Sequence, residues 1–270
     1  MSIASASTPA RFAESVESRA FALVDAPAMR ELLGAGVPGT DAAAFADSWN
    51  DLPLDEYMAD GGRYRRRRHA VYIAEAGGLA RQPDQPHFQT LAHNPLNGGI
   101  ARWFAPIRAD IGDAPILRSV IDLLVSMSDR LRGTTGRWRV EVHQFRIEAH
   151  AGELGQPTPE GMHRDGVDFV LVMLMGRRNA AHGVTTIANP AGVPLASFRL
   201  SRPFDAMILD DARVRHGVSP ITPMDAARPA IRDALVVTAA MAHARARRPQ
   251  LRATAASSRP ASPRDTARWR

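Results

Sequence analysis

The C-terminal half of the sequence consists of short apolar or alternating segments that are separated by Gly, Pro and Asn. Such a series is typical of an antiparallel all-β unit, in which each segment forms one strand. The segments follow one another at intervals of about 8 to 20 residues, which predicts a jelly roll, in which two small sheets face each other around an open mouth. The predicted strands cover residues 137–148, 167–175, 184–188, 195–200, 206–209, 214–218 and 232–241.

The N-terminal third has the apolar spacing of helices. Residues 11–24 and 28–33 carry apolar side chains at helical intervals, and Asp41 is placed to cap a further helix through residue 46. The clearest helix is predicted over residues 113–132, and we expect it to pack flat against a sheet. Its signals are Asp113 as N-cap, Pro115 in the first turn, Gly133 just past the end, and a stripe of Ile116, Val120, Leu124, Met127 and Leu131. The predicted fold is therefore mainly β with α, a jelly roll buttressed by N-terminal helices.

The composition narrows the chemistry and the compartment. The sequence contains no cysteine, which excludes disulfides, Cys-ligated zinc and a Cys nucleophile. Any metal ion must therefore be held by histidines and carboxylates. The sequence has no run of 18 or more apolar residues and no charged-then-apolar leader, so we expect no membrane partner and a cytoplasmic location.

The net charge of +6 belongs to the end of the chain. Residues 243–270 hold eight Arg and one Asp, so the first 242 residues carry a charge of about −1. This tail is rich in Pro, Ser, Ala and Arg and has no apolar periodicity, which predicts disorder. A solvated tail is favoured over a nucleic-acid arm. The predicted parts are a helical segment over residues 1–50, a β domain with supporting helices over residues 51–242, and the tail.

His163 and Asp165 stand directly before an apolar segment, in the stretch "EGMHRDGVDFVL". Composition alone predicts about 0.6 His-x-Asp triplets, so the pair gains meaning only from its surroundings. If residues 162–175 form one strand, the two side chains point to the same face, about 6 to 7 Å apart, and both reach one metal ion. His216 is placed to add a third ligand from a neighbouring strand. Two imidazoles and one carboxylate make the facial triad of non-heme Fe(II) oxygenases.

Four longer stretches carry a family resemblance: "WRVEVHQFRIEA", "PEGMHRDGVDFVLVMLMGRRN", "PFDAMILDDARVRHGVSPI" and "ARPAIRDALVVTA". Over residues 52–240, the chain resembles the Fe(II)/2-oxoglutarate-dependent dioxygenases. It is most similar to the isoleucine dioxygenase-like branch, which hydroxylates free L-amino acids. The resemblance implies a cupin-like double-stranded β-helix with His163, Asp165 and His216 as the iron ligands.

The resemblance also implies a cation for the co-substrate. In this family an Arg on the strand after the distal histidine binds the far carboxylate of 2-oxoglutarate, and Arg232 matches that position. The planar guanidinium suits this task because it donates two parallel hydrogen bonds to one carboxylate. Arg228 is the competitor, but Pro229 follows it and indicates a loop. Many relatives place a Ser two residues after this Arg, and here the position is Ala234, so the second partner of the carboxylate is left open.

The implied cofactors are Fe(II), 2-oxoglutarate as co-substrate and O2. The implied reaction hydroxylates a free, aliphatic L-amino acid while 2-oxoglutarate is converted to succinate and CO2. In such a reaction the protein contributes positioning and the exclusion of water. The sequence leaves open the amino acid and the carbon that react, sulfoxidation or desaturation as other outcomes, and the oligomeric state.

Several further residues are weighed between a functional and a structural role. Gln144 is a candidate for substrate contact if it faces the mouth, whereas a hydrogen-bonded core residue explains His143 more simply. Asp210 and Asp211 either orient the distal histidine or form a turn. In "GGRYRRRRHA", residues 61–70, a solvated face is favoured over an arginine lid that pairs with a substrate carboxylate. The histidines without partner spacing, taken as structural or surface residues, are those at positions 69, 87, 93, 150, 182 and 243.

Three other functions are alternatives. A nucleic-acid demethylase of the same superfamily would use the basic tail as its arm, but such enzymes usually carry a second Arg six residues after the first, and here the position is Thr238. A non-catalytic jelly-roll protein that binds a small ligand has no need of both an open iron site and a carboxylate clamp. A metallohydrolase would need a Glu as base, and Glu160, three residues before His163, is the candidate.

Overall fold

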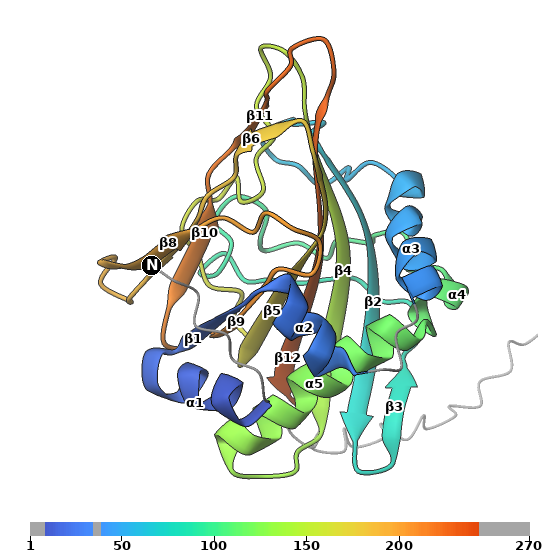
Figure 1. Ribbon diagram of the computed structural model, residues 1–270, viewed down its shortest axis with the longest axis vertical. Coiled ribbons are helices and arrows are strands. Elements are labelled where there is room, and N and C mark those ends of the chain that lie inside the picture. The colour runs from blue at the N-terminus through green and yellow to red at the C-terminus, as the bar shows by residue number, and fades with distance from the viewer. Residues whose placement is uncertain (1–8, 35–38, 243–270) are drawn as a thin grey trace, which may run out of the picture.

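The structure is a computed structural model, and it describes residues 9–34 and 39–242 (Figure 1). Its centre is a seven-stranded antiparallel sheet, the major sheet, in the order β1-β9-β5-β12-β4-β2-β3. The two longest strands, β12 and β4, pair along their whole length, from Ala230 opposite Ala149 to Met241 opposite Trp138. The strands of this sheet are β1 (Phe21–Val24), β2 (Arg65–Glu75), β3 (Gly78–Arg81), β4 (Trp138–Ala149), β5 (Phe169–Arg178), β9 (Ala206–Asp210) and β12 (Ala230–Met241).

A second layer of short strands faces the major sheet. It contains a three-stranded sheet in the order β10-β7-β8 and a two-stranded ribbon of β11 and β6. Two isolated bridges extend it, because Gly155 pairs with Ile221 and His163 pairs with His216. Two facing antiparallel sheets of this kind form a double-stranded β-helix, so the predicted fold class is confirmed. The strands of this layer are β6 (Ala180–His182), β7 (Thr185–Ala188), β8 (Pro194–Phe198), β10 (Arg215–Val218) and β11 (Ile221–Pro223).

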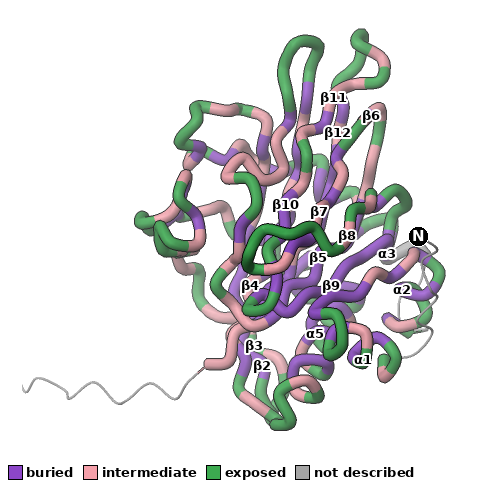
Figure 2. The backbone as a smooth tube through the Cα atoms, turned by 90° about the vertical axis from the view of Figure 1, so that its left-hand side faces the viewer, coloured by how far each residue is buried: buried purple, intermediate pink, exposed green. Residues whose placement is uncertain are grey.

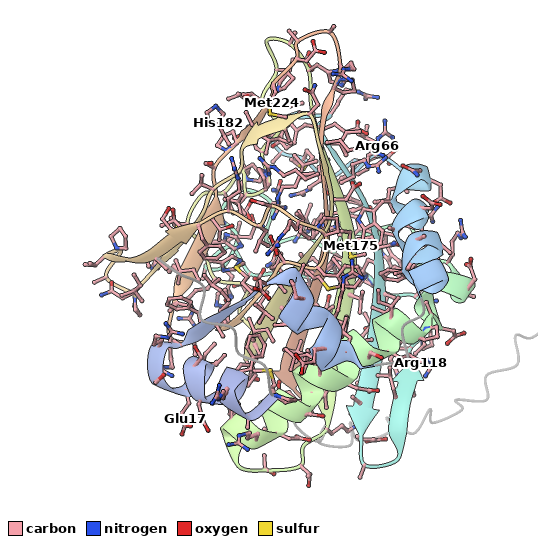
Figure 3. The ribbon with its side chains drawn as sticks, viewed as in Figure 1. Glu17, Arg66, Arg118, Met175, His182 and Met224 are labelled. Atoms are coloured by element: carbon pink, nitrogen blue, oxygen red, sulfur yellow. The ribbon has the colours of Figure 1, made fainter. Side chains whose placement is uncertain are left out.

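Helices cover the face of the major sheet that points away from the short strands (Figure 1). The largest apolar cluster lies between these helices and the sheet, and it includes Trp49, Trp138 and Met175, the last of which is labelled in Figure 3. Burial of this cluster is the main favourable term for the fold. The helical elements are α1 (Pro9–Arg19), α2 (Ala26–Leu33), α3 (Gly39–Asp47), η1 (Ser48–Asp51), α4 (Ala109–Gly112) and α5 (Pro115–Arg132).

Alternation along β12 divides its side chains between the two faces of the major sheet. Leu235 and Val237 pack into the cluster under the helices, whereas Ala234 and Val236 line a cavity between the two sheets. The central strands β9, β5, β12 and β4 are buried along most of their length (Figure 2). This explains why β5 and β12 have near-continuous apolar sequences rather than a clean alternation.

The helix predicted over residues 11–24 is wrong in its second half. α1 ends at Arg19, Ala20 takes a left-handed backbone with φ of 67°, and the chain continues as β1. The strand Phe21–Val24 is mostly buried and pairs with β9. Burial against the edge of the sheet therefore outweighs the helical spacing of these residues.

The helix predicted over residues 113–132 is confirmed except at its start. Gly133 ends it in the left-handed conformation, with φ of 65°. The N-cap is Ala114 rather than Asp113, because Asp113 still belongs to the end of α4. The Asp113 carboxylate instead accepts a hydrogen bond from Arg118 at 2.6 Å. The predicted stripe is buried at Ile116, Val120, Leu124 and Met127.

The seven predicted strands are confirmed to within three residues at each end. The strands that were not predicted from the sequence are β1, β2, β3, β6 and β11. β2 was missed because its arginines were read as a solvated run, and β6 and β11 have three residues each. α3 contains residues 41–46 as predicted, although it begins at Gly39 rather than after a cap at Asp41.

No helix within residues 9–34 and 39–242 is long and apolar enough to cross a membrane. The cytoplasmic location stays a prediction. The basic tail predicted to be disordered, residues 243–270, lies outside the described residues. The division into parts at residue 50 also stays a prediction.

Candidate active site

The structure brings together the three residues predicted as iron ligands. The backbone N–H of His163 donates to the carbonyl oxygen of His216 at 3.0 Å, and the reverse bond has the same length. The two imidazole rings therefore lie side by side, with centroids 4.5 Å apart. The Asp165 carboxylate lies 3.9 Å from His163 Nε2 and 3.6 Å from His216 Nε2. The three residues offer ligand atoms within 4.8 Å of one another.

Hydrogen bonding and burial select the atoms that face an ion. His163 Nδ1 lies 3.0 Å from the Gly161 carbonyl oxygen, which accepts a hydrogen bond from Nδ1–H and leaves Nε2 free to bind an ion. Burial works against the protonated form of His163, but Asp165 and Glu160 raise its pKa above the ordinary value. Burial, together with the neighbouring His163, lowers the pKa of His216 to about 3. His216 is thus a neutral imidazole at neutral pH, the form that binds a metal ion.

The loop that carries Asp165 corrects the prediction of one strand over residues 162–175. β5 begins only after this loop, because Gly166 takes a left-handed backbone with φ of 80° that an extended strand does not allow. The Asp211 carboxylate accepts hydrogen bonds from the backbone N–H groups of Asp165, Gly166 and Val167 at 2.9, 2.8 and 3.2 Å. Asp211 therefore holds the ligand loop, rather than the distal histidine as one interpretation of the sequence had it.

Replacing Asp211 by alanine is expected to lower the affinity for Fe(II) by about 10- to 100-fold. Three backbone N–H groups lose their acceptor, so the loop no longer fixes the Asp165 carboxylate. Competition with a chromophoric chelator under anaerobic conditions measures this affinity. The neighbouring Asp210→Ala variant is the control, because Asp210 Oδ1 accepts a turn hydrogen bond from Ala212 N–H at 3.1 Å. Equal Fe(II) affinity in the two variants would show that Asp211 does not position the ligand.

Arg232 lies in β12, on the wall of the cavity between the sheets. It is 5% exposed, its Nε has no hydrogen-bond partner, and no carboxylate within residues 9–34 and 39–242 lies within 4.0 Å of it. Asp233 points to the other face and binds Arg146 at 2.7 Å. Burial lowers the pKa of Arg232 to about 10, so it is still a cation at neutral pH. The competitor Arg228 is exposed and pairs with Asp225 at 2.9 Å.

The cavity has a volume of about 300 Å³, and its wall includes His163, Asp165, His216 and Arg232. The candidate iron ligands and the buried guanidinium thus open into one space. Ala234 also lines this space and contributes no hydroxyl, so the second partner of a carboxylate at Arg232 is still unassigned. The apolar part of the wall includes Phe145, Ile147, Val167, Val172, Met207, Val218 and Val236.

In the arginine run of residues 61–70, alternate side chains from Arg65 onwards are buried. This corrects the interpretation that favoured a solvated face. Arg65 and Arg67 are 5% and 3% exposed and line the cavity from β2. They share the buried Asp55 carboxylate, at 2.8 and 3.5 Å, and the Arg67 guanidinium stacks over Phe104 at 3.6 Å. Burial favours the protonated form of Asp55, but Arg67 and Arg65 hold its pKa below the ordinary value.

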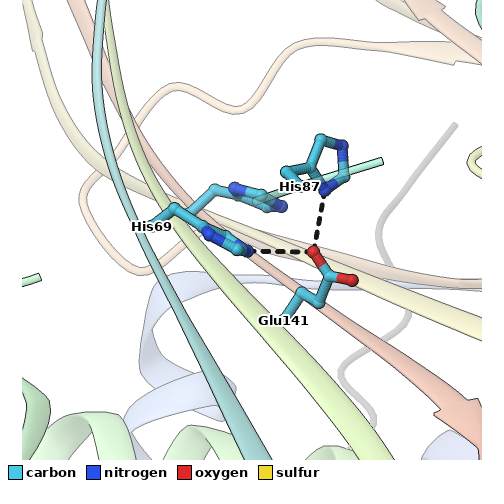
Figure 4. Close-up of side chains that lie close together, drawn as sticks. His69, His87 and Glu141 are labelled. Carbon is cyan, nitrogen blue, oxygen red and sulfur yellow. Dashed lines mark hydrogen bonds and ion pairs between the residues drawn. The ribbon is translucent and has the colours of Figure 1, made fainter. Parts of the chain in front are cut away.

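A second cluster of histidines lies on the same wall (Figure 4). His69 Nε2 and His87 Nδ1 lie 2.9 and 2.7 Å from one oxygen of Glu141. Arg139 donates to the other oxygen at 2.9 Å, and His143 stacks on His69 with centroids 4.7 Å apart. Burial lowers the pKa of both His69 and His87, so they act as neutral donors to the carboxylate. His69 and His87 therefore do have partners, and His143 is buried and hydrogen-bonded as predicted.

Gln144 does not face the mouth, which corrects its prediction as a substrate contact. Its side chain is 1% exposed, and Nε2 donates to Ser48 Oγ at 2.7 Å. Ser48 belongs to η1, on the side of the major sheet that the helices cover. The strand alternates, so the neighbours His143 and Phe145 line the cavity and Gln144 points away from it.

Replacing Gln144 by leucine is expected to lower the free energy of unfolding by about 1 kcal/mol, because the buried Ser48 hydroxyl loses a partner. The KM values for substrate and for 2-oxoglutarate are expected to stay unchanged. Urea unfolding and steady-state kinetics measure the two effects. A large change in either KM would indicate that Gln144 does contact the substrate or 2-oxoglutarate.

A comparison with family models matches residues 46–238 to the family described as 2OG-Fe dioxygenase. This match covers well over half of the chain. Among curated proteins, the chain is similar to the 3(1)-hydroxy-L-isoleucine 4-dioxygenase of Pantoea ananatis, with 26% identity over 193 residues, which is 70% of this chain and 77% of that protein. The family resemblance seen in the sequence is confirmed.

The solved structures extend this comparison. The chain is similar to a bsmA homolog from Methylobium petroleophilum PM1, with a TM-score of 0.80 and 34% identity over 87% of this chain and 93% of that one. It shares the fold of IDO from Bacillus thuringiensis, with a TM-score of 0.72 and 18% identity over 87% of this chain and 96% of that one. The chain therefore belongs to the 2OG-Fe dioxygenases, a family of oxidoreductases that use Fe(II), 2-oxoglutarate and O2.

Proposed function

We propose that this protein hydroxylates a free, aliphatic L-amino acid, with 2-oxoglutarate converted to succinate and CO2. His163, Asp165 and His216 are the proposed ligands of Fe(II), and Arg232 is the proposed partner of the far carboxylate of 2-oxoglutarate. The observation that carries the proposal is the placement of an unpaired, buried guanidinium on the wall of the same cavity as the His-Asp-His cluster.

The residues present fit Fe(II) and 2-oxoglutarate. Two imidazoles and one carboxylate are the ligand set of the facial triad, which leaves further coordination positions for small ligands. The unpartnered Arg232 Nε matches a carboxylate, since a buried cation without a counter-ion costs several kcal/mol until an anion binds to it. When bound, Fe(II) with 2-oxoglutarate and O2 supplies the oxidant for an unactivated C–H bond. The chain itself holds the reactants in position and excludes water.

The proposed substrate class rests on a relative and on the cavity wall. The similar protein from Pantoea ananatis is named for 3(1)-hydroxy-L-isoleucine. Apolar side chains such as Val167 and Val218 lie on the wall beside the His-Asp-His cluster, which suits an aliphatic group. The family assignment favours an oxygenase over the metallohydrolase alternative, so Glu160 is no longer assigned as the base of a hydrolase.

The experiment measures conversion of 2-oxoglutarate to succinate with Fe(II) and ascorbate, in the presence of each of the twenty L-amino acids. Coupled turnover with an aliphatic amino acid, and a product heavier by one oxygen atom, would support the proposal. No turnover with any amino acid and no uncoupled background would favour a non-catalytic binder. Turnover with a methylated oligonucleotide, lost on deletion of residues 243–270 together with salt-dependent binding, would favour a demethylase.

A further inference from the structure

Not every charged group on the cavity wall has a partner of opposite charge nearby. Arg65 and Arg67 share Asp55, and Arg139 pairs with Glu141 at 2.9 Å. Each of these five groups has an oppositely charged partner within the protein, although Arg65 and Arg67 share one carboxylate. In the described part of the chain, the wall then retains two arginines with no carboxylate within 4.0 Å, Arg102 and Arg232, and one carboxylate outside the His-Asp-His cluster with no arginine within that distance, Glu160.

Arg102 is held rigidly in the cavity wall. It is 1% exposed, and its backbone exchanges two hydrogen bonds with His87, at 2.9 and 3.0 Å. Its guanidinium donates to Gln89 Oε1 at 2.9 Å, while its Nε has no partner. Gln89 in turn donates to the Asp165 carboxylate at 3.3 Å. Arg102 is therefore a fixed cation, one side chain away from a proposed iron ligand.

Glu160 is a buried carboxylate with an unused oxygen. Its side chain is 8% exposed, and its Oε2 has no hydrogen-bond partner. Its Oε1 lies 3.6 Å from His163 Nε2, which is the atom that we assign to the ion. Once the imidazole is committed to the ion, Glu160 has no cationic partner of its own. A buried charge in this position is costly unless a ligand supplies the opposite charge.

We propose that Arg102 binds the carboxylate and Glu160 binds the ammonium group of the substrate amino acid. This inference rests on the proposed function and names its recognition site. An α-amino acid carries its two opposite charges on neighbouring atoms, and the cavity offers one unpaired charge of each sign in addition to Arg232. The wall groups that have no arginine or carboxylate partner within 4.0 Å thus match one carboxylate of 2-oxoglutarate and one zwitterion, and the apolar wall is left for the side chain.

The assignment predicts which parts of a ligand each residue recognises. The probes are L-isoleucine, its deamino analogue 3-methylpentanoate and its amide L-isoleucinamide, or the same series for the most active amino acid of the substrate screen. Their Kd values are measured by calorimetry on the anaerobic enzyme with Fe(II) and 2-oxoglutarate bound. The wild-type enzyme is expected to bind the intact amino acid at least about 100-fold more tightly than either analogue, since each analogue leaves a buried charge unpaired.

Two variants then separate the two contacts. E160Q is expected to weaken L-isoleucine about 100-fold and to lose the preference over 3-methylpentanoate, while it keeps the preference over the amide. R102Q is expected to show the opposite pattern, and R102K to recover part of the affinity. The affinity for 2-oxoglutarate is expected to stay within about threefold of the wild-type value. A merely structural role would weaken all three probes equally.

The controls are residues of the same charge outside the cavity wall. Arg66→Gln changes a partly exposed arginine that pairs with Glu148 at 3.0 Å, and Glu153→Gln changes an exposed loop residue. Neither should alter the ratios between the probes. Unchanged ratios in both E160Q and R102Q, with wild-type binding intact, would overturn this inference alone. If the variants do not fold, equal wild-type affinity for the three probes overturns it. Absence of turnover with every amino acid would instead overturn the proposed function.

Discussion

Replacing His216 by alanine is expected to reduce turnover by at least about 100-fold, and to abolish the charge-transfer absorbance of the anaerobic enzyme with Fe(II) and 2-oxoglutarate. Loss of a partner that only orients a ligand already costs about 10- to 100-fold in metal affinity or activity, and here the ligand itself is lost. His216 is buried among the proposed ligands and its imidazole is neutral, so the variant removes a donor that is ready to bind. Spectroscopic titration with Fe(II) measures the change directly.

The control for this variant is His182→Ala. His182 is an exposed residue on β6, at the far tip of the short-strand layer (Figure 3). It is expected to retain both the absorbance and the activity. If H216A kept Fe(II) binding with wild-type affinity, the proposed iron site would be wrong. Circular dichroism distinguishes loss of Fe(II) binding from loss of the fold, and the fold is expected to persist because the His163–His216 backbone bonds do not need the imidazole.

Replacing Arg232 by glutamine is expected to raise the KM for 2-oxoglutarate by about 100- to 1000-fold. Removing one partner of a buried ion pair costs about 3–5 kcal/mol, and about 1.4 kcal/mol corresponds to each factor of ten. The neighbouring Arg146 does not replace the lost cation, because it is bound to Asp233 on the other face of the sheet. Steady-state kinetics with varied 2-oxoglutarate, at saturating amino acid, measures the effect.

Arg228→Gln is the matched control for Arg232→Gln. Arg228 lies four residues earlier and was the alternative from the sequence, but it is exposed and bound to Asp225. Its KM for 2-oxoglutarate is expected to stay at the wild-type value. A larger effect of R228Q than of R232Q would reverse the assignment. Fe(II) affinity measured without 2-oxoglutarate should be the same in both variants.

The sequence predicted the strands of the double-stranded β-helix well because their signals are local. Each strand from β4 onwards, apart from β6 and β11, has a Gly, Pro or Asn within three residues of at least one end, and the longer ones show an apolar pattern. The sequence also predicted the cluster of His163, Asp165 and His216, although the single strand predicted over residues 162–175 was wrong. The three residues meet through a backbone bridge and a turn that Asp211 stabilises, and neither feature has a signal in the spacing alone.

The rest of the cavity was not predictable, because it depends on pairing between distant segments. Arg65, Arg67 and His69 form one inward row only if β2 is a strand, and a run of four arginines hides that alternation. These basic side chains can be buried because Asp55 and Glu141 supply carboxylate partners from other segments. The prediction that Gln144 contacts substrate was wrong because a shift of one position along a strand reverses the direction of the side chain.

The reciprocal backbone bonds between His163 and His216 have a consequence for metal exchange. Two donors that lie far apart in the sequence are fastened to each other through their own peptide groups, so the entropy of bringing them together is lost when the polypeptide folds rather than when the ion arrives. Ion capture then requires little rearrangement of the scaffold. Other divalent ions of comparable size suit the same three proposed ligands, so discrimination for iron would depend on cellular supply and on the coordination positions that the protein does not fill.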